Sequence, residues 1–173
     1  MNHEKLLARL AEPKLDDLLA DWRWLVQEEA SLIAVTAMGD MVLRRNDGSI
    51  WFLDTIEGNY NRIADSENDY LKLLTSRDFR RKYMQYHCVL CLVESGVELD
   101  TNQCYSPNVP PHLGGELDEE NLKPTDVYVH FSVSGQLWEQ TKDLKPGAKV
   151  RIEVIPPPGE RDLLSRVFGF GKG

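Results

Sequence analysis

The spacing of apolar residues changes along the chain, and this change predicts the elements. Apolar positions first recur at helical spacing, which predicts helices over 6–10 and 14–28 on either side of Pro13. From Ser31 the apolar runs are short and separated by turn signals such as Asp47-Gly48. Strands are expected over 31–37, 41–45, 50–55 and 60–64, and tight turns of this kind predict an antiparallel meander.

The middle of the chain returns to helical spacing. Ser66 begins one predicted helix, and a second is expected from Ser76 to Ser95. Residues 100–125 are rich in Pro, Gly and Asn, which predicts a long irregular connection. Such a connection in a compact domain is usually functional or specifically packed.

The last third reads as strand, helix and strand. Apolar residues alternate over 126–134, with Val127 and Val129 among them, which predicts a strand. A short helix is expected over 136–144 and a last strand over 150–154. The tail that follows is apolar in part, and its role is left open.

These elements predict an α+β fold: an antiparallel sheet of short strands packed against helices, with an N-terminal helical stub. The expected division is an N-terminal helical extension over 1–30, an α+β domain over 31–155 and a C-terminal tail over 156–173. A chain of 173 residues can bury enough surface to fold without disulfides or a metal ion.

Composition narrows the classes of function. Twenty Lys and Arg against 28 Asp and Glu give a net charge of −8, which argues against nucleic-acid binding and indicates a basic partner or solubility. No apolar run approaches the ~20 residues of a membrane helix, and the N-terminus lacks a signal-peptide pattern. We therefore expect a cytoplasmic protein that does not bind membranes, and three cysteines fit a reducing compartment.

The negative charge is concentrated in one segment. Residues 94–143 alone carry a net −8, and their densest point is Glu116, Asp118, Glu119 and Glu120. Such a run is either a solvated loop or a surface that meets a basic protein. Trp24 is a second candidate contact, because Trp22 and Trp24 cannot share one helix face and one of them is expected to be at least partly exposed.

Residues with catalytic potential are scattered. Cys88-x-x-Cys91 lies in an apolar helix without a second pair, so buried thiols are expected rather than a zinc site. His130 would project opposite the valines of its predicted strand, either exposed or in a polar network. Gly114-Gly115 indicates a turn with positive φ or a close backbone approach. We expect no metal, no cofactor and no catalytic site.

An ordered set of segments from about Trp22 to Val150 resembles a known family. The segments of this set are Asp21-Trp22-Arg23-Trp24-Leu25, Val35–Arg44, Asp47–Gly58, Arg62–Ser66, Gln103-Cys104-Tyr105, Pro110–Gly115, Glu120-Asn121-Leu122, Val129-His130-Phe131, Gly135-Gln136 and Lys142–Val150. In this order and spacing, the set resembles the C-terminal domain of Tdi-type immunity proteins of the bacterial type VI secretion system.

The resemblance implies a non-enzymatic immunity protein that binds a toxic effector, a DNase in the best-known branch, and neutralises it by non-covalent occlusion. A basic nuclease would complement the acidic run. The expected partner-binding residues are Glu116, Asp118, Glu119 and Glu120, with Trp24 as an aromatic anchor.

Two other classes of function stay open. The first is a hydrolase that reverses a toxin's modification and uses His112, His130 or Cys104. The second is a small-ligand or regulatory module without a toxin partner.

Overall fold

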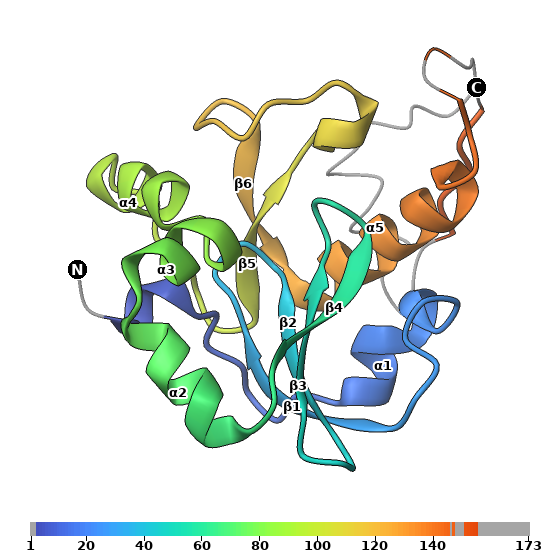
Figure 1. The fold of residues 1–173 in the computed structure, drawn as a ribbon. Coiled ribbons are helices and arrows are strands. Elements are labelled where there is room, and N and C mark those ends of the chain that lie inside the picture. Colours follow the sequence, from blue (N-terminus) through green and yellow to red (C-terminus); the bar gives the residue numbers. More distant parts are fainter. Residues whose placement is uncertain (1–2, 146, 148–150, 156–173) are drawn as a thin grey trace.

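The centre of the molecule is a four-stranded antiparallel sheet (Figure 1). The computed structural model describes residues 3–145, 147 and 151–155. The strands follow one another in space as in sequence, which confirms the predicted meander. They are β1 (Ala30–Val35), β2 (Met41–Arg45), β3 (Ile50–Asp54) and β4 (Asn59–Ala64).

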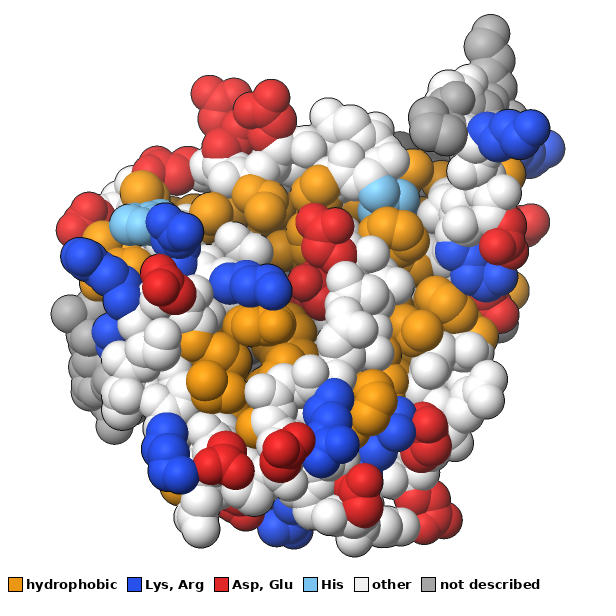
Figure 2. Space-filling view, in the orientation of Figure 1, with side chains coloured by type: hydrophobic (Ala, Val, Ile, Leu, Met, Phe, Trp, Pro, Cys, Tyr) orange, Lys and Arg blue, Asp and Glu red, His pale blue; other side chains and the backbone are white. Residues whose placement is uncertain are grey.

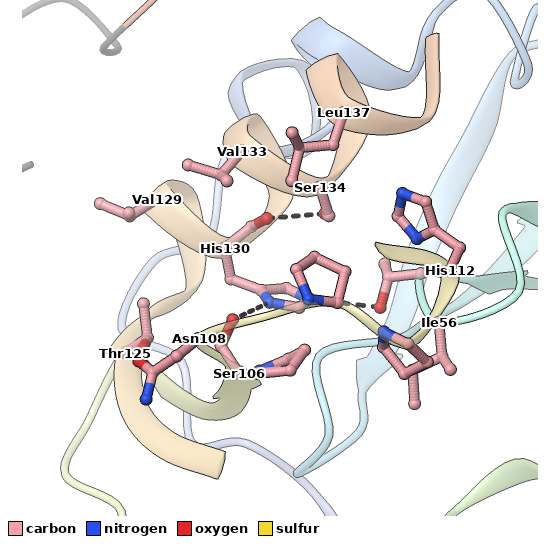
Figure 3. A pocket seen from close by; sticks show the side chains of 14 residues that line it. Ile56, Ser106, Asn108, His112, Thr125, Val129, His130, Val133, Ser134 and Leu137 are labelled. Carbon is pink, nitrogen blue, oxygen red and sulfur yellow. Dashed lines mark hydrogen bonds between the residues drawn. The ribbon is translucent and has the colours of Figure 1, made fainter. Parts of the chain in front are cut away.

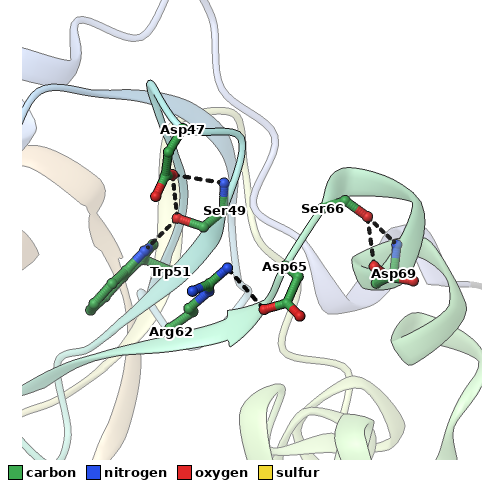
Figure 4. A network of polar contacts seen from close by, with 7 residues as sticks. All are labelled: Asp47, Ser49, Trp51, Arg62, Asp65, Ser66 and Asp69. Carbon is green, nitrogen blue, oxygen red and sulfur yellow. Dashed lines mark hydrogen bonds and ion pairs between the residues drawn. The ribbon is translucent and has the colours of Figure 1, made fainter.

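Short polar side chains shape the ends of these strands (Figure 4). The Asp47 carboxylate accepts hydrogen bonds from the backbone N–H and the hydroxyl of Ser49, and Gly48 has φ +84°. This pattern closes the β2–β3 hairpin. After β4, Ser66 accepts a hydrogen bond from the Asp69 N–H and caps the next helix, as predicted.

Helices cover both faces of the sheet (Figure 1). One face packs against α2 (Glu67–Thr75), α3 (Arg77–Tyr83) and α4 (Tyr86–Glu94) through Val42, Ile50 and Phe52. The other face, which carries Leu43 and Leu53, packs against the layer that contains α1 (Leu15–Leu19). Because strands β2 and β3 are covered on both sides, they read as near-continuous apolar runs.

Two predicted helices are shorter than expected. The predicted helix over 76–95 is divided, because Gln85 takes the left-handed conformation at φ +42° and separates α3 from α4. This change of direction at Gln85 lets Phe79 of α3 and Val89 of α4 both pack in the core. Near the N-terminus a 3-10 turn, η1, spans His3–Leu6, and the helix expected over 14–28 is reduced to α1 and a second 3-10 turn, η2 (Ala20–Trp22).

The predicted strand over 126–134 is wrong. Residues 127–134 belong to helix α5 (Val127–Thr141), which also contains most of the short helix expected over 136–144. Asp126 caps the helix by accepting hydrogen bonds from the N–H groups of Tyr128 and Val129. Alternate apolar residues appear because α5 is buried on more than one side, so the pattern does not separate helix from strand.

The segment expected to be irregular contains two strands. β5 (Gln103–Pro107) and β6 (Leu122–Asp126) pair antiparallel, and a 3-10 turn, η3 (Pro111–Leu113), lies between them. In the expected last strand, residues 151–155 have no regular secondary structure, while Val150 and the tail over 156–173 lie outside the described residues.

Candidate functional site

A cavity lies between α5, the β3–β4 turn and the start of the segment between β5 and β6 (Figure 3). This segment, residues 108–121, is called the β5–β6 connection below. Its volume is about 50 Å³, and most of its surface is apolar. Val129, Val133 and Leu137 of α5 form one wall, while the connection and Ile56 form the other. The polar side chains that reach it include Ser106, His112, His130 and Ser134. The site therefore joins three separate segments of the chain.

His130 is buried at the floor of this cavity, where its polar neighbours determine its tautomer. Its Nε2 lies 3.0 Å from the Gly39 carbonyl, which can only accept, so Nε2 carries the proton. Burial lowers the pKa of His130 to about 4, so the ring is neutral at pH 7. Nδ1 is then an acceptor for the Ser106 hydroxyl at 2.8 Å. The polar-network alternative is confirmed for His130, and exposure is wrong.

Asp40 continues this network into the sheet. Its Oδ1 accepts hydrogen bonds from the Thr55 N–H at 2.9 Å and the Thr55 hydroxyl at 3.1 Å. Its Oδ2 accepts from the Thr36 hydroxyl at 3.2 Å. Burial raises the pKa of Asp40 to about 8, and the nearby charge of Asp54 adds to this. Thr55 lies 3.2 Å from His130 and links the two groups.

The network is a poor catalytic centre. Ser106 and His130 form a nucleophile–base pair in geometry, but a base with a pKa of about 4 is weak, and a carbonyl rather than a carboxylate holds its other nitrogen. Cys104 is fully buried, and burial holds the pKa of its thiol well above the ordinary range. Within the described residues, no three His, Cys, Asp or Glu side chains are grouped to hold a metal ion.

His112 stands at the edge of the cavity. Its ring stacks on Trp138 with centroids 4.0 Å apart, and Trp138 donates to the Thr55 carbonyl at 2.9 Å. Both ring nitrogens of His112 are buried and have no hydrogen-bond partner among the described residues. Burial lowers the pKa of His112, which favours the neutral ring.

The β5–β6 connection is held in one shape by Asn121. Its Oδ1 accepts from the Val109 N–H at 2.8 Å, and its Nδ2 donates to the carbonyls of Val109 and Glu116. A Cβ atom on Gly115 would lie 1.7 Å from the Val109 carbonyl oxygen, which confirms the expected close approach there. Gly114 has φ +96°, so the expected turn is confirmed as well.

The four predicted acidic residues are all exposed on this connection. Figure 2 shows acidic side chains at the top of this face, over the connection, with hydrophobic side chains below them. Asp118 also has a structural role, because its carboxylate accepts from the N–H groups of Glu120 and Asn121. Glu119 accepts from the Ser95 hydroxyl at the end of α4 at 2.8 Å. Glu116 and Glu120 have side chains turned to solvent.

Trp24 lies elsewhere, in the layer of α1 and α5. It is half-buried, and its ring stacks on Trp22 with centroids 5.8 Å apart. The expectation of opposite faces is wrong, because η2 ends at Trp22 and helical spacing stops there. Trp22 is buried and Trp24 is partly exposed, as expected for one member of the pair.

Sequence reasoning missed the cavity and two exposed apolar side chains on the connection that forms part of its wall. Val109 is 47% exposed and Leu113 is 38% exposed, and both belong to the connection. The available signal was the pair of apolar residues flanking Pro110-Pro111 within a polar segment. Contiguous apolar patches at a surface are typical of interaction sites, whereas single exposed apolar side chains are ordinary.

No helix in the described part of the chain is long and apolar enough to cross a membrane.

Residues 64–138 match the family described as T6SS immunity protein Tdi1, C-terminal. The fold is similar to the crystal structure of Atu4351 from Agrobacterium tumefaciens, with a TM-score of 0.55 and 16% identity over 77% of this chain and 68% of that chain. No curated protein matches the sequence significantly. The matched residues include α2 to α4, both strands of the smaller sheet and most of α5. The resemblance seen in the sequence is thus confirmed: over residues 64–138 this chain matches the C-terminal domain family of the T6SS immunity protein Tdi1.

Proposed function

We propose that this protein binds a cognate type VI secretion effector and neutralises it by non-covalent occlusion. The family match over residues 64–138 is the observation that carries the proposal. The buried Cys104 thiol and the weakly basic His130 support inhibition by occupancy rather than by chemistry on the toxin.

The effector that fits this surface best is a DNase. An enzyme that holds DNA presents Lys and Arg to the phosphates, so its active-site groove is basic. The exposed Glu116, Asp118, Glu119 and Glu120 offer the complementary charge on one ordered connection. Opposite charges of this kind speed encounter and disfavour wrong partners. Trp24 stays a second predicted contact, to be tested separately.

The test uses the effector encoded beside this protein, in a catalytically inactive form for binding and an active form for survival. We expect Glu116→Lys/Glu120→Lys to weaken binding by about tenfold and to reduce protection in proportion. These two positions are chosen because their side chains hold no part of the loop, whereas reversal at Asp118 would remove two backbone contacts.

Glu29→Lys is a control for charge reversal elsewhere on the surface, since Glu29 is exposed and lies just before β1. Failure of the wild-type protein to bind or protect would overturn the proposed function. Normal affinity in the double variant would show only that the acidic residues lie outside the interface.

The hydrolase alternative named His112, His130 or Cys104, and the structure adds Ser106 as a candidate nucleophile through its contact with His130, which makes a separate prediction. Occlusion predicts that Ser106→Ala keeps both binding and protection, because the change removes one hydrogen bond to His130. An enzyme would instead bind the effector normally and lose protection, as measured by survival of co-expressing cells.

A further inference from the structure

We propose that the cavity beside His112 receives a single apolar side chain from the effector, while Lys or Arg residues around that side chain meet the acidic connection. This inference rests on the proposed function and names the contact that anchors it. Interfaces commonly combine an apolar centre with a polar rim, and a few anchors seated in pockets carry most of the binding energy.

The apolar centre is present on the surface. Val109 and Leu113, both exposed, belong to the same connection as Glu116 and Glu120, and His112 lies directly before Leu113. The other exposed large apolar side chains of the described residues lie on α2 or toward the C-terminal end of the described chain, at Leu71, Leu144 and Ile155. Exposed apolar and acidic side chains therefore coincide in the β5–β6 connection.

The size of the cavity selects the occupant. Sites for cofactors and drug-sized ligands usually measure ~300–1,000 Å³. A volume of about 50 Å³ leaves room for a water or the end of one side chain. The cavity thus favours an anchor side chain over a small-molecule ligand.

The lining excludes a charged occupant. None of the described residues that line the cavity carries a carboxylate, and Val129, Val133 and Leu137 form a whole wall. A Lys or Arg inserted here would lose its hydration without gaining an ion pair, which is costly. The basic groups of the partner must therefore lie outside the cavity, where Glu116 and Glu120 are exposed.

The mouth of the cavity is shaped before binding. Pro110 and Pro111 restrict the backbone, and Asn121 ties Val109 to Glu116 across the connection. A wall that is already ordered loses little entropy when a partner binds. The His112 ring is held at the edge of the cavity by its stacking on Trp138.

The experiment measures affinity for the catalytically inactive effector with two pairs of variants. Val133→Trp fills the cavity mouth from α5 at a half-buried position, and Leu71→Trp places the same ring on the exposed face of α2. Leu113→Ala removes an exposed apolar side chain of the connection, directly after the lining residue His112, and Leu71→Ala removes one on α2. We expect at least a tenfold loss of affinity for Val133→Trp and Leu113→Ala, and wild-type affinity for both Leu71 variants.

The outcomes separate this inference from the proposed function. Wild-type affinity in Leu113→Ala, together with wild-type affinity in a folded Val133→Trp, would overturn the cavity as anchor site and leave effector binding intact. Equal losses in the Leu71 variants would overturn it as well, because the effect would not be local. If the wild-type protein does not bind the effector, the proposed function fails and the anchor fails with it. Circular dichroism of every variant reports folding, and Asn108→Trp, which fills the cavity from an exposed lining position on the connection, provides the decision should Val133→Trp unfold.

Discussion

At the scale of single residues, the buried polar chain from Asp40 through Thr55 to His130 joins the sheet to α5. Gly39 makes this possible, because a Cβ atom there would lie 2.3 Å from Nε2 of His130. The positive φ of +83° at Gly39 also suits glycine. The Gly39-Asp40 pair therefore fixes the packing of a helix that lies some ninety residues later in the chain.

The raised pKa of Asp40 predicts a pH dependence of stability. Asp40 keeps its proton to about pH 8 when folded but releases it near 3.8 when unfolded, so its contribution is full below 3.8 and is lost as the pH rises through about 8. His130 acts in the other direction, and only below its unfolded value of 6.5. Between pH 6.5 and 8 we expect the free energy of unfolding to fall by roughly 1 kcal/mol per pH unit.

Urea unfolding at several pH values measures this fall. Asp40→Asn keeps an acceptor for Thr55 and cannot ionise, so its stability should change less over the same interval. Cys104, the neighbouring thiol, stays protonated in this range because burial raises its pKa well above the ordinary value. Parallel curves for the wild type and Asp40→Asn would contradict the assignment.

At the scale of elements, the β5–β6 connection shows how a segment without regular structure becomes rigid. Asn121 supplies three hydrogen bonds across it, and Gly115 allows the two sides to approach closely. The composition of residues 100–125 correctly indicated turns and close approaches, but β5 and β6 form only because they pair with each other. In α5, the cap at Asp126 identifies a helix where alternation suggested a strand.

Removing the three Asn121 hydrogen bonds should loosen the connection. We expect Asn121→Ala to lower the free energy of unfolding by about 1–2 kcal/mol, because it removes three exposed hydrogen bonds across the connection. The amide of Val109 should exchange its hydrogen faster, and effector affinity should fall as the surface loses its fixed shape. Asn61→Ala on exposed β4 is the control, since it removes one exposed side-chain contact. Equal effects in the two variants would show that the Asn121 hydrogen bonds do not hold the connection in shape.

At the scale of the whole molecule, two helical layers enclose the sheet, and the smaller β5–β6 sheet carries the acidic connection on its outer end (Figure 1). Residues 94–143, which include this connection, carry a net charge equal to the −8 of the whole chain, so the negative charge is concentrated on this part of the surface. Long-range attraction between such a surface and a basic effector would act before contact and would be screened by salt.

The association rate should therefore depend on ionic strength. We expect the rate constant for effector binding to fall by about tenfold or more as salt rises from low to physiological concentration, while the dissociation rate changes little. Stopped-flow or surface-based kinetics measure both rates. Glu116→Lys/Glu120→Lys should show a shallower salt dependence, and Glu29→Lys should follow the wild type more closely. A salt-independent wild-type rate would contradict electrostatic steering.

The chain by itself determined the meander, the cap at Ser66, the turn at Gly114-Gly115 and the place of the acidic run. These features depend on local spacing, turn chemistry and side-chain type, and all of these are set by residues that are close together in the sequence. Tertiary structure alone decided that β5 and β6 pair, that His130 is buried and neutral, and that a cavity lies beside His112. Each of these depends on which distant segments pack together, because burial, a shared hydrogen-bond partner and an enclosed space exist only between elements that are already in contact.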